Sequence, residues 1–132
     1  MRAADTPFAY AILRVVPSVE RGECVNVGVV VFCRQLDFLD LRTAVDDRRL
    51  TALAPGLDLA DVRASLAAIR AVVCGDRAAG ALAALPPSER FGWLVAPAST
   101  IIQPSKVHTG LTQDPRATLD RLFGALVATP AD

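Results

Sequence analysis

Apolar and polar positions alternate along the first third of the chain in a pattern typical of β-strands. Three segments rich in apolar and β-favouring residues occupy 8–16, 24–33 and 36–42, and short polar turns at 18–23 and 34–35 separate them. Pro17 ends the first segment and Gly22 lies in the first turn. The short spacing between the segments predicts an antiparallel three-stranded meander.

The segment 24–33 has the strongest strand pattern in the chain. Its odd-numbered positions are all apolar, whereas its even-numbered positions include Asn26 and Gly28. Since successive side chains of a strand point to opposite faces, the apolar set is predicted to lie together against helices. This set comprises Val25, Val27, Val29, Val31 and Cys33.

Helical patterns follow the meander. Asp46 and Asp58 are placed to begin helices, the second of which would end at Gly75, and a helical turn or two is expected over 78–85. Ser88 is predicted to cap a short helix through Leu94. A last helix begins at Asp114 and Pro115, a preferred start in which a capping oxygen precedes a proline at the first helical position. The predicted buried stripes are Leu59, Val62, Leu66, Ile69 and Val73 in the second helix, and Leu119, Leu122, Phe123, Leu126 and Val127 in the last.

Between these helices, residues 99–109 return to an extended pattern that Pro104 interrupts. Because proline cannot donate a ladder hydrogen bond, this segment is predicted to be an edge strand or a strand broken by a bulge. The fold expected is therefore α+β: an antiparallel sheet from the meander, extended by the later strand and packed on one face by helices. We expect one domain over 1–132, strand-rich at 8–42, helix-rich at 46–95, with a strand segment at 99–109 and a helix at 115–128.

Composition and charge argue against several classes of function. Fourteen basic residues balance fourteen acidic ones and form no basic block, so nucleic acid is an unlikely partner. No apolar run reaches the length of a signal peptide or a membrane span. No metal-ligand spacing, cofactor loop or nucleophile motif is present, so no metal and no cofactor are expected. Cys24, Cys33 and Cys74 have no C-x-x-C spacing and favour a reduced, cytoplasmic protein.

The end of the predicted hairpin brings several polar residues together. A turn centred near residue 20 would place Arg14 across from Asn26, and Ile12 across from Gly28, with Arg21 and Glu23 close by. A guanidinium, an amide and a carboxylate beside a glycine could bind a carboxylate, a phosphate or a peptide backbone. Alternatively, Arg14 and Asn26 stabilise the hairpin itself or pair with another element of the same domain.

A second polar group lies between Ser99 and Thr109. A serine near His108 suggests acyl transfer, although a lone histidine on a strand is more often structural. The hydroxyls of this segment are also candidates for phosphorylation by a partner kinase. As a further alternative, the edge strand could pair with a second copy of the chain and form a homodimer. The candidate binding residues here are Ser99, Gln103, Ser105 and His108, and nearby Trp93 and Phe91 are expected to pack in the core.

Two strings of residues carry a family resemblance. The front string includes Tyr10, Arg14, Pro17, Arg21, Gly22, Glu23, Asn26, Val27 and Gly28; the rear string includes Arg90, Phe91, Trp93, Leu94, Pro97, Ser99, Gln103, Ser105, His108, Gly110, Asp114, Pro115, Leu122 and Phe123. Together they resemble the bacterial domain-of-unknown-function family DUF3037. The resemblance adds Arg90 to the candidate binding residues and departs at Ala98, where many members have arginine.

The family resemblance also implies a partner. Members of the DUF3037 family are frequently encoded beside a HipA-like protein kinase. A non-catalytic accessory or binding protein that acts with such a kinase is therefore expected. The alternative is a small hydrolase or transferase that uses the Ser99 to Thr109 segment.

Overall fold

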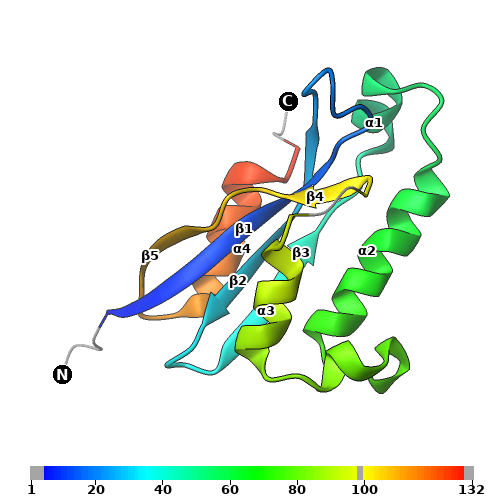
Figure 1. Cartoon of the computed structure of the whole chain (residues 1–132). Helices are drawn as coiled ribbons and strands as arrows, with labels where there is room; N and C mark the ends of the chain where they lie inside the picture. The colour runs from blue at the N-terminus through cyan, green and yellow to red at the C-terminus, as the bar shows by residue number, and fades with distance from the viewer. Residues whose placement is uncertain (1–4, 98–99, 130–132) are drawn as a thin grey trace.

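The fold is built on an antiparallel sheet of five strands, seen in a computed structural model that describes residues 5–97 and 100–129. The strand order is β3-β2-β1-β4, and β5 also pairs with β1 (Figure 1). The first three strands form the expected meander, and the α+β class is confirmed. The strands are β1 Thr6–Val15, β2 Val25–Cys33, β3 Phe38–Thr43, β4 Ile102–Pro104 and β5 His108–Thr112.

Aspartates begin the main helices, as the sequence predicts. Asp46 caps α1, Asp58 accepts hydrogen bonds from the backbone of Ala60 and Asp61 at the start of α2, and Asp114 accepts one from Ala117 in α4. The capping role expected of Ser88 is wrong, because the helix already begins at Pro87 with Pro86 in the cap position. The α-helices are α1 Asp47–Leu53, α2 Leu59–Val73, α3 Pro87–Val95 and α4 Pro115–Leu126, with short 3-10 helices η1 Arg77–Ala79 and η2 Ala81–Ala84.

Helices cover both faces of the sheet, not one. Residues of α1, α2 and α3 pack on one face with Leu13, Val27 and Val30. On the other face α4 packs against Val29, Val31 and Cys33 (Figure 1). The expectation that the helices beginning near Asp58 and Asp114 cover the same face is therefore wrong.

A β-bulge explains why the odd-numbered apolar residues of β2 divide between two cores. Leu13 pairs with Gly28, but the next residue, Arg14, pairs with Asn26, so Val27 is the extra residue. An extra residue reverses the in-and-out alternation of the strand beyond it. Arg14 does lie opposite Asn26 as predicted. The predicted pairing of Ile12 with Gly28 is wrong, since Ile12 pairs with Val29.

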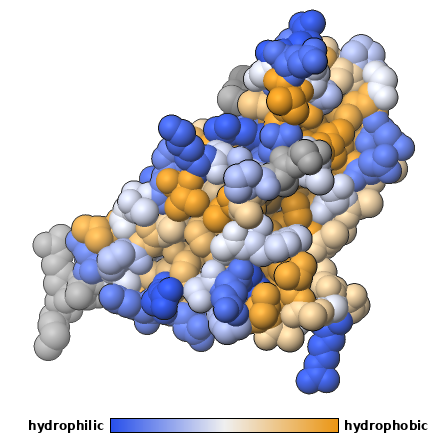
Figure 2. Space-filling view, in the orientation of Figure 1, coloured by the Kyte–Doolittle hydropathy of each residue, from blue (hydrophilic) through white to orange (hydrophobic). Residues whose placement is uncertain are grey.

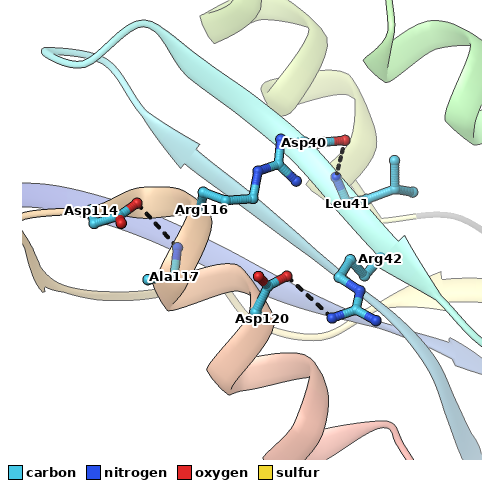
Figure 3. Close-up of polar contacts among 7 residues, drawn as sticks. All are labelled: Asp40, Leu41, Arg42, Asp114, Arg116, Ala117 and Asp120. Carbon is cyan, nitrogen blue, oxygen red and sulfur yellow. Dashed lines mark hydrogen bonds and ion pairs between the residues drawn. The ribbon is translucent and has the colours of Figure 1, made fainter.

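Two arginine–aspartate pairs join α4 to β3 at the margin of the apolar contact (Figure 3). Arg42 reaches Asp120 at 3.1 Å and Arg116 reaches Asp40 at 2.6 Å. Each guanidinium also covers an aromatic ring, Phe123 for Arg42 and Phe38 for Arg116. These cations keep their alkyl stems on apolar surface while their charged ends stay partly in water.

Two further expectations concern the thiols and membranes. Cys24, Cys33 and Cys74 are all free thiols. Among the described residues, no helix combines the length and the apolar character that crossing a membrane requires.

Candidate functional site

Three polar side chains form a row across neighbouring strands. Arg14 on β1 lies between Asn26 on β2 and Gln103 on β4, each directly paired with it. Directly paired residues of antiparallel strands present their side chains on the same face. We call Gln103, Arg14 and Asn26 the polar row, and it lies on the face of the sheet that α4 covers.

The polar row is largely occupied by contacts within the protein. The Asn26 amide donates to the carbonyl of Leu126, near the end of α4, at 3.0 Å, and the Gln103 amide donates to the carbonyl of Thr100 at 3.1 Å. Arg14 Nε is buried and has no hydrogen-bond partner in the described part of the chain. Arg14 and Asn26 are both only half-buried. The contact of Asn26 with α4 agrees with the alternative that this residue pairs with another element of the same domain, and Asn26 helps to position α4.

Arg21 and Glu23 contact each other in the β1–β2 turn. Arg21 Nε lies 2.5 Å from Glu23 Oε1, and the two side chains are 74% and 43% exposed. Exposed pairs of this kind contribute little to stability. Both charges already have a partner in each other, so the turn offers an outside anion no unpaired cation at Arg21.

Arg90 of α3 closes the end of α2. Its guanidinium donates to the carbonyls of Val72 at 3.2 Å, Val73 at 2.5 Å and Leu85 at 2.9 Å. The last carbonyls of a helix lack partners within the helix and carry a partial negative charge, which a cation satisfies. Arg90 therefore has a structural role at the junction of α2 and α3.

We expect replacement of Arg90 by methionine to lower the free energy of unfolding by about 1 kcal/mol, because the carbonyls of Val72 and Val73 lose a charged donor. Chemical denaturation measures this loss. Methionine at Arg77, an exposed residue of η1, is the control and should change stability by less than about 0.5 kcal/mol. Equal effects of the two substitutions would contradict the role assigned to Arg90.

Ser105 lies where the last strand breaks. Its backbone N–H donates to the carbonyl of Ile12, its Oγ accepts from the Ile12 N–H, and its hydroxyl donates to the carbonyl of Lys106, each at 2.8 Å. One serine thus continues the ladder with β1 between β4 and β5. The predicted interruption of the strand is confirmed, and the buried hydroxyl is fully used in holding it.

His108 does not lie in a catalytic arrangement with the described residues around it. It is exposed on β5, and its ring stacks on Tyr10 with 5.1 Å between centroids. Thr100 uses its hydroxyl on the carbonyl of Ile102 at 2.7 Å. Ser99 and Ala98 lie outside the described residues. No group of three metal-ligating side chains occurs in the described part of the chain.

An apolar groove lies on the opposite face of the sheet, between α2, α3 and β4. It has a volume of about 360 Å³. Figure 2 shows hydrophobic surface gathered along the hollow between α2 and α3. We call it the Trp93 groove; it is lined chiefly by Leu13, Ile69, Trp93, Leu94, Ile102 and Pro104, with Ser65 and Thr100 adding hydroxyl groups.

Trp93 lies at the surface, so the expectation that it packs in the core is wrong. Phe91 is buried, as expected, and stacks on Phe32, but Trp93 remains 44% exposed. Residues two apart on a helix point in nearly opposite directions, so Phe91 and Trp93 cannot both enter one core. The helical spacing itself was the signal that could have identified Trp93 as a surface residue.

Comparison with known proteins gives one match. The model of a family described as "Protein of unknown function (DUF3037)" matches residues 10–127, which cover β2 to α4 and most of β1. No curated protein and no solved structure matches the chain.

Proposed function

We propose that this chain, which belongs to the DUF3037 family, is a non-catalytic binding protein whose partner is a HipA-like protein kinase. The observation that carries the proposal is the Trp93 groove, an apolar surface with a half-exposed tryptophan at its margin. Tryptophan is enriched among the residues that dominate protein–protein binding energy. The choice of a kinase as the partner comes from the family resemblance.

The alternative of a small hydrolase or transferase has less support. The hydroxyl of Ser105 is buried and bonded on both sides, and His108 stacks on Tyr10, so neither is arranged as a nucleophile or its base. Burial also makes Ser105 a poor acceptor for a phosphate, whereas Thr100 and Thr109 are exposed. A cytoplasmic location stays part of the proposal and is supported by the free thiols.

The test is binding between the purified full chain and a HipA-like kinase from the same organism, measured by calorimetry. We expect association, and we expect alanine at Trp93 to weaken it about tenfold, because a large aromatic anchor loses its contact area. If the chain and the kinase do not associate, the proposed function is wrong.

Alanine at Val19 is the matched control. Val19 is a hydrophobic side chain with 71% exposure in the β1–β2 turn, outside the Trp93 groove. Its replacement should leave kinase affinity unchanged within about twofold. If both variants bind like the unmodified chain, the partner contacts a surface other than the Trp93 groove.

A further inference from the structure

The strand β5 ends the sheet with an edge that has no neighbour within the described residues. β5 pairs with β1 through His108 to Thr112, and the strand path on the other side of β1 continues through β2 to β3. Figure 1 places β5 at the outer margin of the sheet. The backbone groups on the outer side of β5 are therefore open to another extended chain.

The other edges of the same sheet are protected and β5 is not. On β3 the N–H of Leu41 is already bonded to Asp40 Oδ1 at 2.8 Å, and β4 is three residues long and ends at Pro104, which has no N–H. Charges, prolines and short length are the usual devices that stop edges from pairing. β5 has five residues, His108–Thr112, with no proline, lysine, arginine, aspartate or glutamate among them.

An exposed leucine accompanies this open edge. Leu111 is 65% exposed, and Val107, just before the strand, is 43% exposed. Leu111 pairs with Pro7, so its side chain lies on the face of the sheet that α2 and α3 cover further along β1. A strand added to β5 would cover Leu111.

The geometry points to a second copy of this chain as the occupant: we propose a two-fold symmetric dimer in which the β5 strands pair antiparallel about Gly110. In this register all five residues of β5 find partners, with Thr109 opposite Leu111 of the partner subunit and His108 opposite Thr112 of the partner subunit. The isologous contact closes on itself, so pairing stops at a dimer.

Charge complementarity selects this register. Continued past the ends of β5, antiparallel pairing about Gly110 brings Lys106 toward Asp114 of the partner subunit, and the symmetry forms the contact twice. Both side chains are exposed, and Asp114 uses one carboxylate oxygen to cap α4. Pairing about Leu111 would instead leave His108 and Thr109 without partners within β5, and it would not bring Lys106 to Asp114 of the partner subunit. The proposed contact is independent of the Trp93 groove and of the kinase.

Sedimentation velocity of the full chain, from micromolar to millimolar concentration, tests the dimer. We expect a concentration-dependent dimer whose dissociation constant rises about tenfold in Lys106→Glu, since two attractive pairs become repulsive, and at least about tenfold in Leu111→Lys. Both residues are exposed, so circular dichroism should show a folded chain in each variant. Leu36→Lys, which changes an exposed leucine in the β2–β3 turn, should dimerise normally.

Disulfide trapping tests the register. Cysteines at Thr109 and Leu111 together, with Cys24 and Cys74 changed to serine, should form covalent dimers, because directly opposed Cα atoms lie about 4.5–5.5 Å apart. Either cysteine alone would be diagonal to its copy at about 7–8 Å and should cross-link far less.

Three results would overturn the proposal. The first is a chain that stays monomeric at every concentration. The second is a dimer unaffected by Leu111→Lys and Lys106→Glu. The third is a monomer whose β5 edge binds a strand of another protein.

Discussion

Alanine at Leu119 should lower the free energy of unfolding by about 3 kcal/mol, within the range of about 2–5 kcal/mol for buried leucines. Leu119 is fully buried where α4 meets Val29, Val31 and Cys33. The sheet beneath it is held by strand pairing on both sides of β2 and cannot move to fill the space. Urea denaturation followed by circular dichroism gives the measurement.

Two controls on the same helix separate apolar packing from charge. Leu126 is only partly buried, so its replacement by alanine should cost less than half as much. Alanine at Asp120 removes the ion pair with Arg42. The Arg42 and Asp120 side chains are 46% and 51% exposed, so this substitution should lower the free energy of unfolding by less than about 1 kcal/mol. If Asp120→Ala lowered the free energy of unfolding more than Leu119→Ala, charge and not burial would hold α4 to the sheet.

Alanine at Ser105 should lower the free energy of unfolding by about 2 kcal/mol, because it leaves a buried N–H without an acceptor. The affected donor is the N–H of Ile12, which now bonds to Ser105 Oγ at 2.8 Å. Both residues are buried, so water cannot easily replace the hydroxyl. Denaturation measures the global loss. Amide hydrogen exchange at Ile12 measures the local one, which should be about 30-fold faster.

Valine at Thr100 is the matched control for Ser105. The Thr100 hydroxyl also donates to a nearby carbonyl, that of Ile102. Because Thr100 is exposed, water can replace this hydrogen bond. The expected cost is less than about 0.5 kcal/mol. If Ser105→Ala were as mild as Thr100→Val, with unchanged exchange at Ile12, the break between β4 and β5 would not depend on the serine hydroxyl.

The candidate site could be predicted from the sequence only in part. The pairing of Arg14 with Asn26 followed from the length of the turn between them, and the register confirms it. What each side chain contacts did not follow, because the partner of Asn26 is the carbonyl of Leu126, 100 positions along the chain. Likewise, Arg90 closes the end of α2 through a contact that only the packing of α3 on α2 brings about.

The sequence by itself determined the local elements of this protein. Aspartates at Asp58 and Asp114 begin helices, apolar spacing marks their buried stripes, and turn residues set the meander, because caps, periodicity and turns act over a few residues. Only the tertiary structure decided which face each element covers. The bulge at Val27 depends on how β1 and β2 pair, and it divides the valines of β2 between two cores, so α4 lies on one side and α2 and α3 on the other. The same packing leaves Trp93 and Leu111 exposed, since burial is a property of contacts between distant segments.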